Sequence, residues 1–371
     1  MTASALQGSA APTFARHETF HPRYGWIHKG FTQAARNPNI FLEPDATVTL
    51  GVGKNMVSAI RFWSSAFKVL REVPNPARPR VSLSTPTPFG TALLSEDGWD
   101  PYLEDPGSVW LLHWHLLAPT SLAPAWWVAF NAFAPLQFDE SQLTAHIADL
   151  AASAGWPSVV EASIKKDVDC MLRMYTARRQ GRQGLDDVLD CPFRELGLIE
   201  AVPGETRSWR FNTGDKQNLP DEIVVYACLD FASRVAPGAS SMTVARLAAD
   251  PGSPGMVFKL SEAVLYETLR RAADHTTDIS VAEPGGLRQL IFNSASGELA
   301  PSILERHYAA TTGSTAKLVR ESPVDAVGDV PHASRGMEKR LAKLDADIEN
   351  ATPMKKLELI QRRLELVGEA K

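Results

Sequence analysis

The amino-acid sequence predicts a mainly α fold with small β hairpins, in which winged helix-turn-helix modules surround a helical middle region. Two observations predict this class. In the longest periodic segments, apolar residues recur every three or four positions, which is the spacing of one helix face. The strand-like segments are short and lie beside proline or glycine turns, after pairs of helical segments. We therefore expect these regions: a flexible start at 1–18, an N-terminal winged-helix-like DNA-binding region at 19–117, a helical middle region at 118–184, a second region with a winged-helix-like module at 185–310, a linker at 311–334 and a helical hairpin tail at 335–371.

The first region contains the elements of a winged helix in order. Residues 21–37 have the composition of a first helix, and the apolar spacing over 55–72 predicts a second. The segment VPNPARPR at 73–80 cannot stay helical, because it has three prolines in eight residues. Residues 80–98 read as a strand, a threonine–proline turn and a short helix, which is how many winged-helix domains end their wing.

Residues 99–293 are read as a helical stretch followed by a second module. Asp105 followed by Pro106 is a helix start, with an N-cap and a proline at the first helical position. Residues 124–180 are mainly helical. Three helical segments at 220–235, 241–250 and 260–274 precede a hairpin that turns at Pro284, Gly285 and Gly286.

The tail carries apolar residues at heptad-like steps on both sides of Pro353, which predicts a helical hairpin or short coiled coil. We expect it to contact a partner protein or a second copy of the chain.

The charge distribution is uneven although the net charge is only −5. Residues 1–90 carry ten Lys or Arg and four Asp or Glu, a balance of +6, whereas residues 91–150 carry eight Asp or Glu and no Lys or Arg. A basic segment followed by an acidic one suggests an anionic partner beside a cation site; uneven surface chemistry is the alternative reading.

Cysteine usage and the N-terminus predict a cytoplasmic protein. The three cysteines fit neither a CxxC motif nor a zinc pair, and so sparse a set suits a reducing compartment. The N-terminus lacks the apolar core of a signal peptide. The apolar zone at 109–138 is interrupted by histidines and prolines, which predicts buried core and no membrane span.

The segment GVGKN, residues 51–55, raises the question of a nucleotide-binding loop. A phosphate-binding loop needs glycine where Val48 stands and serine or threonine where Asn55 stands, so we expect no nucleotide cofactor. Lys54 instead lies at the start of a predicted helix in the recognition region of the first module, where it could bind DNA backbone phosphate. The predicted DNA contacts, each with a solvated helix face as the alternative, are Lys54, Asn55, Arg61 and Lys68 in the first module and Lys259, Arg270 and Arg271 in the second.

Three segments carry a family resemblance: FHPRYGWIHKG, GVGKNMVSAIRFW and DGWDPYLEDPGSVWLLHW. The chain resembles a bacterial family known as a domain of unknown function, whose members occur beside sulfur-handling genes in DNA phosphorothioation defence islands. The resemblance spans about residues 18–310, and its third segment is the most specific. It implies a divalent-metal-dependent nickase that opens one DNA strand for sulfur insertion by partner proteins, as part of anti-phage defence. The resemblance does not identify catalytic residues in this sequence.

The acidic loop before residue 106 is the first candidate for that chemistry. Metal-assisted phosphodiester cleavage needs carboxylates that hold Mg²⁺ or Mn²⁺ against a phosphate oxygen. We expect the metal ligands to be Asp97, Asp100 and Glu104. The candidate catalytic residues are Asp100, Glu104, Asp105 and His113, the last as a proton donor or water-orienting group. Helix caps and a hydrogen-bonded core histidine are the structural alternatives.

The sequence thus predicts an endonuclease that nicks double-stranded DNA and works with sulfur-transfer and ATPase proteins of the same system. Two alternatives stay open. The chain could be a DNA-binding adaptor that recruits the sulfur-transfer enzymes without cleaving DNA, or a winged-helix transcription regulator.

Overall fold

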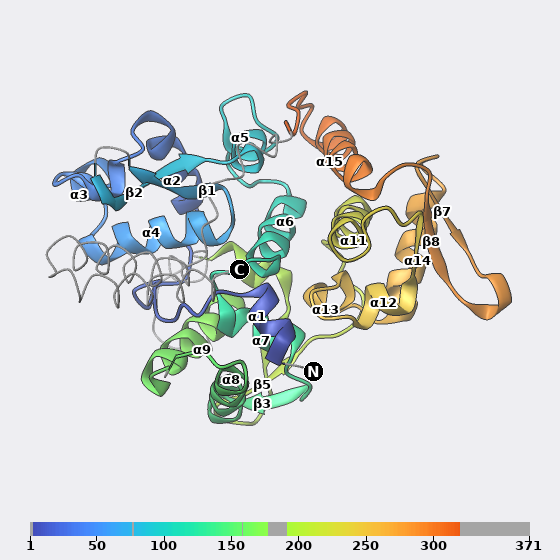
Figure 1. The fold of residues 1–371 in the computed structure, drawn as a ribbon, viewed down its shortest axis with the longest axis horizontal. Coiled ribbons are helices and arrows are strands. Elements are labelled where there is room, and N and C mark those ends of the chain that lie inside the picture. Colours follow the sequence, from blue (N-terminus) through green and yellow to red (C-terminus); the bar gives the residue numbers. More distant parts are fainter. Residues whose placement is uncertain (1–2, 76–77, 158, 177–190, 320–371) are drawn as a thin grey trace, which may run out of the picture. The chain divides into compact units, whose positions relative to one another are not determined.

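Helices joined by short antiparallel sheets make up the computed structural model, which describes residues 3–75, 78–157, 159–176 and 191–319 (Figure 1). The predicted fold class, mainly α with small β hairpins, is confirmed at this level. All of the described residues belong to the compact unit Met1–Arg320. The predicted helical hairpin tail at 335–371 and the linker beyond residue 319 lie outside the described residues.

The N-terminal residues belong to the core, although the sequence suggested a flexible start at 1–18. Helix α1 spans Ala3–Ser9, and Leu6 is completely buried. The His17 side chain, 1% exposed, pairs with Asp167 at 2.8 Å, and the backbone N–H of Ala15 donates to the same carboxylate. Apolar and charged contacts therefore fix this segment.

Residues 26–86, which we call module A, contain helices followed by a two-stranded hairpin. Gly30 of the first helix lies so close to Ile60 and Ser64 that a β-carbon there would fall 2.6 Å from the Ser64 hydroxyl. The Trp63 indole N–H donates to the Phe20 carbonyl and fixes the helix that carries it. The elements are α2 (Trp26–Arg36), η1 (Ile40–Leu42), α3 (Ala46–Leu50), α4 (Lys54–Ala66), β1 (Leu70–Asn75) and β2 (Arg78–Pro86).

Three helices follow module A before the next sheet, and their buried faces form the centre of the core. Asp105 caps the second of them through the Gly107 N–H, as its Asp-Pro start predicted. The largest fully buried side chains include Trp110, Trp114, Trp126 and Trp127. The helices are α5 (Pro88–Leu94), α6 (Pro106–Leu117) and α7 (Pro124–Asn131). In the described part of the chain, each helix is too short or too polar to cross a membrane.

Residues 124–211, or module B, form a three-stranded sheet, and two of the described helices lie between its first and second strands in the sequence. Strand β5 lies between β3 and β4, and both pairings are antiparallel. The pairing of Phe138 with Trp209 crosses the boundary that the sequence suggested at 184/185, because β3 needs the later hairpin as its partner. After α7 the elements are β3 (Gln137–Asp139), α8 (Glu140–Ser153), α9 (Glu161–Tyr175), η2 (Pro192–Leu196), β4 (Ile199–Ala201) and β5 (Ser208–Phe211).

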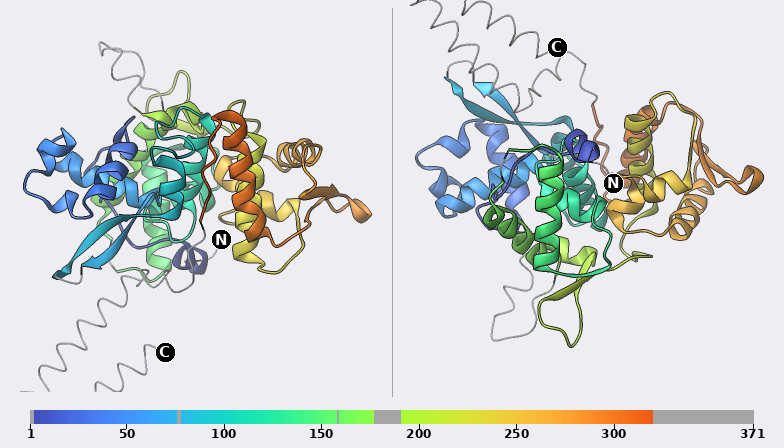
Figure 2. Two further views of the ribbon diagram at one scale, coloured as in Figure 1. Left: turned by 90° about the horizontal axis from the view of Figure 1, so that it is seen from above. Right: turned by 60° about the horizontal axis from the view of Figure 1, so that its bottom comes forward.

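Residues 221–292, or module C, repeat the strand order of module B. The third strand again lies between the first two, and the β7–β8 hairpin turns at 284–286 as the sequence predicted. Figure 2 shows this hairpin extending past the helices of the module. The elements are α11 (Asp221–Val235), β6 (Ser241–Thr243), α12 (Val244–Ala249), α13 (Pro254–Phe258), α14 (Glu262–Ala273), β7 (Ile279–Ala282), η3 (Pro284–Gly286) and β8 (Gln289–Phe292), followed by α15 (Ser296–Thr311), which packs on α11.

Candidate functional site

The acidic loop at 97–105 is organised by the Asp100 carboxylate. This side chain is 4% exposed and accepts hydrogen bonds from the backbone N–H groups of Glu104 and Asp105, both at 2.9 Å. The Ser108 hydroxyl donates to it as well, at 2.6 Å. Both carboxylate oxygens are therefore engaged inside the protein, and the predicted catalytic and metal-binding roles of Asp100 do not fit this geometry. Asp97 and Glu104 are exposed.

His113 is a core residue. It is completely buried, its Nδ1 lies 2.8 Å from the Tyr175 hydroxyl, and its Nε2 lies 3.0 Å from the Val257 carbonyl. Burial lowers the pKa of His113 to about 4. Both ring nitrogens have protein partners and the side chain is buried, so this geometry gives no support for the predicted catalytic role of His113.

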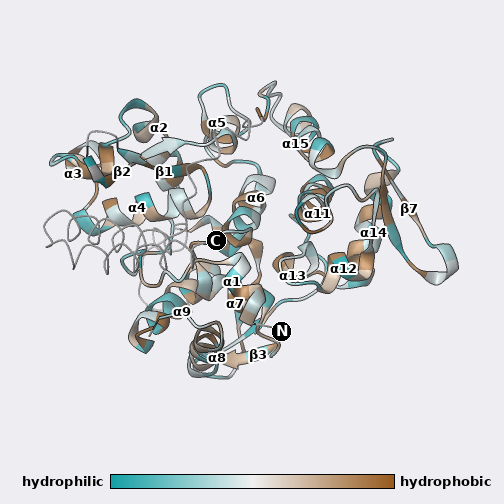
Figure 3. Ribbon diagram, viewed as in Figure 1, coloured by the Kyte–Doolittle hydropathy of each residue, from teal (hydrophilic) through white to brown (hydrophobic). Residues whose placement is uncertain are grey.

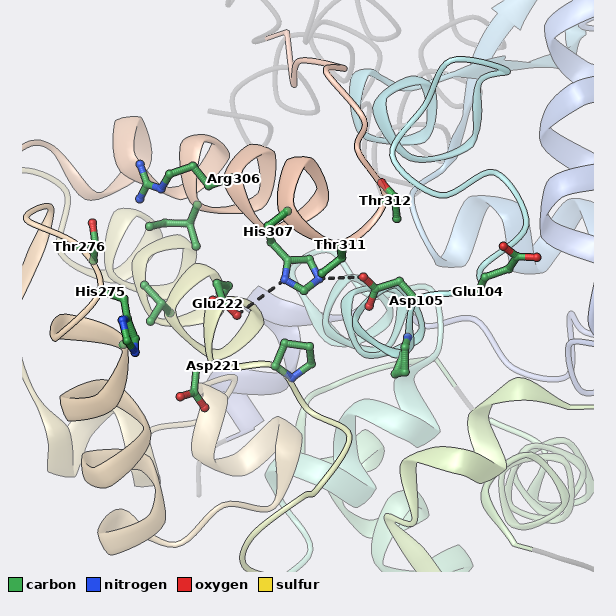
Figure 4. Close-up of a pocket in the computed structure, with 16 residues that line it drawn as sticks. Glu104, Asp105, Asp221, Glu222, His275, Thr276, Arg306, His307, Thr311 and Thr312 are labelled. Carbon is green, nitrogen blue, oxygen red and sulfur yellow. Dashed lines mark hydrogen bonds and ion pairs between the residues drawn. The ribbon is translucent and has the colours of Figure 1, made fainter.

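A cleft of about 900 Å³ lies beside the acidic loop, between the start of α6 and helices α11 and α15. Figure 4 shows its side chains converging from these elements. The loop contributes Glu104 and Asp105, so these two predicted residues do reach a cavity. Apolar side chains, among them Val225 and Ile303, also line it. The other polar and charged residues of the lining are Asp221, Glu222, His275, Thr276, Arg306, His307, Thr311 and Thr312.

His307 connects two carboxylates across this cleft (Figure 4). Its Nε2 lies 3.1 Å from Asp105 Oδ2, and its Nδ1 lies 3.7 Å from Glu222 Oε2. Burial works against its charge, but the hydrogen bond to Asp105 and the contact with Glu222 outweigh burial and raise the pKa of His307 to about 9. The imidazolium form therefore dominates at neutral pH. Since both nitrogens face protein carboxylates, the ring acts as a bridge and has no free nitrogen for a substrate.

Three of the four carboxylates that line the cleft, Asp105, Asp221 and Glu222, lie beside a basic side chain of the protein. The Arg271 guanidinium holds Asp221 through two hydrogen bonds, at 2.8 and 3.0 Å. Asp105 accepts from Gly107 and faces His307. Over the described ranges, no three His, Cys, Asp or Glu side chains come together in a group that could hold a metal ion. The predicted metal set of Asp97, Asp100 and Glu104 is thus not assembled.

The predicted DNA contacts in module A fall into two groups. Lys54 and Asn55 are exposed at the start of α4, where Gly53 is the N-cap and no side chain caps the helix, so Asn55 is not a cap. Figure 3 shows this helix start as strongly hydrophilic. Arg61 is paired with Glu72 and donates to the Ser82 carbonyl. Lys68 donates to the backbone carbonyls of Ala118 and Pro119.

The predicted contacts in module C are mostly occupied by protein partners. Lys259 is only 8% exposed, donates to the Phe130 carbonyl at 2.8 Å and lies over the Phe211 ring. Burial lowers the pKa of Lys259 to about 7. Because the side chain is buried and hydrogen-bonded, this structure gives no support for the predicted phosphate contact. Arg271 is bound to Asp221, and the exposed Arg270 is paired with Glu267.

The comparisons with known proteins agree with the resemblance seen in the sequence. Residues 14–308 match the family described as "Protein of unknown function (DUF4007)". The chain belongs to the DUF4007 family. Two solved structures are similar to it, described as "SspB crystal structure", with 45% identity and a TM-score of 0.77, and "Magnesium ion-bound SspB crystal structure", with 44% identity and a TM-score of 0.78. Each similarity covers 82% of this chain and 90% of the SspB chain. No curated protein matches.

This DUF4007 chain thus brings together only part of the predicted site. Glu104 and Asp105 reach the cleft, whereas Asp100 and His113 face inward. His307 and Glu222, which complete the cleft, were missed because His307 lies 202 positions from Asp105 in the chain. The acidic start of α11 and the histidine of α15 carry no local signal that they meet.

Proposed function

We propose that this chain is the DNA-binding, strand-nicking subunit of a DNA phosphorothioation system, acting with a divalent cation and with the sulfur-transfer and ATPase proteins of that system in anti-phage defence. The observation that supports it most is the similarity to SspB over 82% of the chain, at 44–45% identity. The nicking activity is the function that the family resemblance implies. Double-stranded DNA is the proposed substrate.

We further propose that modules A, B and C are three winged-helix units. Among the described residues of module B, a helix, a strand, two α-helices and a hairpin follow one another; module C has the same order with three helices, α12, α13 and α14, between strand and hairpin. In both modules the last strand lies between the first two. Module A has the helices and the hairpin without the first strand. This order supports winged-helix assignments, and helix-turn-helix folds place their later helix in the DNA major groove.

Among the three corresponding helices, α4 is the best candidate for DNA contact. It carries Lys54 and Arg61 and no acidic residue. Helix α9 has three basic and three acidic residues, and α14 has two of each, with both arginines paired to carboxylates. A DNA phosphate is attracted to a helix start that combines free backbone N–H groups with a lysine. Lys54 and Asn55 are therefore the proposed contacts.

The described residues do not fit a preformed magnesium site. A magnesium-bound structure of SspB is a reason to propose Mg²⁺ or Mn²⁺ as the cofactor. However, Asp100 accepts hydrogen bonds from three protein donors, and Asp105 and Asp221 are paired with His307 and Arg271. We therefore derive no cleavage step from these side chains.

Because these carboxylates are already bound by protein groups, a second candidate is favoured: a DNA-binding adaptor that does not cleave DNA itself. The two proposals separate in a supercoiled-plasmid assay with Mg²⁺, Mn²⁺ or EDTA. We expect open-circular product with either cation and none with EDTA. DNA binding without any nicking, alone or with the partner proteins present, would favour the adaptor.

Reversing the charge of Lys54 should weaken DNA binding. We expect Lys54→Glu to lower duplex affinity by roughly tenfold and to reduce the salt dependence of binding by about one released counterion, because one phosphate contact is lost. Fluorescence anisotropy at several salt concentrations measures both effects. The matched control is Lys165→Glu, an exposed lysine on α9. Equal losses in both variants would mean that α4 has no special role.

A further inference from the structure

The loop at 97–105 forms the first half of the most family-specific sequence segment, and the proposed function gives no role to its exposed aromatic residue, Tyr102. Tyr102 is 70% exposed, the second-highest exposure among the large hydrophobic side chains that the structure describes in residues 3–157. Its neighbour Leu103 is 8% exposed. The loop thus buries Leu103 and leaves the neighbouring Tyr102 ring exposed to solvent. An exposed aromatic ring at a fixed position is a candidate binding residue.

Buried contacts fix the conformation of the loop at 97–105. The three hydrogen bonds to the Asp100 carboxylate close it onto the start of α6. Trp99 stacks on Tyr308 at a centroid distance of 4.9 Å, and its indole N–H donates to the Ala316 carbonyl. A ring displayed on such a loop loses little conformational freedom when it binds.

The backbone of the loop adopts an unfavourable conformation that places these side chains. Leu103 has φ +58°, in the left-handed region that non-glycine residues rarely adopt. Such residues persist where the surroundings impose them, often at ligand-binding positions. Here the result is that Leu103 points into the core and Tyr102 remains at the surface.

Tyr102 lies against one other ring, His28 of α2 in module A. Their centroids are 4.8 Å apart and their planes are inclined by 33°. His28 Nδ1 is buried and has no hydrogen-bond partner within the part of the chain that the structure describes. The nitrogen is enclosed by the protein, so what the pair offers at the surface is the aromatic face of Tyr102. His28 belongs to the basic segment 1–90, whose charge balance of +6 suits a polyanion, whereas Tyr102 belongs to the acidic segment 91–150.

We propose that Tyr102, supported by His28, is a stacking platform for an unpaired base of the DNA strand. This inference rests on the proposed DNA-binding function and deepens it. Every base has an aromatic face that stacks on tyrosine, and stacking is tolerant of sequence. The basic segment that carries His28 holds the attached phosphates, and the rigid loop supplies the ring. Unpaired bases occur where one strand has been opened.

Anisotropy with two DNA probes tests the platform: an intact duplex, and the same duplex with a short single-stranded gap. Tyr102→Ala should weaken binding of the gapped probe by about 5- to 100-fold, the usual loss for one stacked base, and change duplex binding by less than about twofold. Tyr102→Trp should restore gapped-probe affinity. The exposed Leu136, 62% accessible in module B, provides Leu136→Ala as a control that should change neither probe. Melting curves establish that each variant is folded.

The outcomes separate the platform from the proposed function. If Tyr102→Ala binds the gapped probe as well as the unaltered protein does, the platform is overturned while DNA binding stands. If it weakens both probes equally, Tyr102 is a duplex contact and the preference for unpaired bases is overturned. If the unaltered protein binds neither probe, the proposed function fails and the platform with it.

Discussion

Replacing His307 with alanine should lower the free energy of unfolding by about 3 kcal/mol. The change removes a buried imidazolium and leaves Asp105, 8% exposed, without its charged partner. Breaking a buried ion pair from one side typically costs about 3–5 kcal/mol, because the remaining charge is desolvated and unpaired. We take the lower end, since Glu222 is half exposed and can be solvated again. Urea unfolding at neutral pH measures the difference.

The same bridge predicts a pH dependence on the alkaline side. His307 has a pKa of about 9 in the folded protein against 6.5 for an ordinary histidine. A group whose pKa is raised by folding contributes its full stability below the unfolded value and loses it as the pH rises through the folded value. Stability from His307 should therefore be complete below about pH 6.5 and lost as the pH passes about 9.

A control residue lies in the same cleft. His275 is exposed there and makes no bridge between carboxylates, so His275→Ala should change the free energy of unfolding by less than about 0.5 kcal/mol. The His307→Ala protein should also lose the alkaline transition. If His307→Ala unfolds at the same urea concentration and with the same pH profile as the unaltered protein, the bridge contributes nothing to folding.

Asp100→Ala should destabilise the protein to a similar extent, by about 3 kcal/mol. The substitution leaves two backbone N–H groups and the Ser108 hydroxyl without their common acceptor, and Leu103 loses the contacts that impose its left-handed backbone. Hydrogen bonds to charged groups contribute about 1.5–3 kcal/mol each, and a part of that loss is recovered by water at the exposed Glu104. Thermal unfolding, followed by circular dichroism, measures the change.

Asp97→Ala is the matched control for Asp100→Ala. Asp97 lies in the same loop but is exposed, so its removal should shift the melting temperature little. The pair also tests the original metal hypothesis. If Asp100→Ala keeps the stability of the unaltered protein and loses only cation binding, Asp100 is a ligand and our structural assignment is wrong.

Local sequence signals predicted those elements whose cause is local. The apolar spacing after Asn55 located α4, the Asp-Pro pair located the start of α6, and the proline–glycine turn located the β7–β8 hairpin. Each of these signals is contained within one turn or one helix face. The family resemblance, carried by three short segments, was likewise confirmed by the match over residues 14–308.

The failures have a common physical origin in contacts between distant segments. Asp100 looked like a metal ligand because acidic residues cluster around it. It is buried beside Trp99, which stacks on Tyr308 from a distant part of the chain, and it is linked to Tyr308 through Ser108. Lys259 looked like a surface lysine, yet α13 ends there with a left-handed residue at φ +55° that turns the side chain toward Phe130. Strand β3 has no independent reason to be a strand, because its pairing partner β5 lies far along the sequence.

The contacts of Trp99 with the end of α15 and the residues after it also bear on how the protein folds during synthesis. A ribosome releases Trp99 long before it releases Tyr308, Thr312 and Ala316, which stack on its ring, donate to its carbonyl and accept from its indole. Domains usually fold from the N-terminus during synthesis. Here the acidic loop stays incomplete until nearly all of the described chain has left the ribosome, so a nascent chain halted before α15 presents this tryptophan to chaperones.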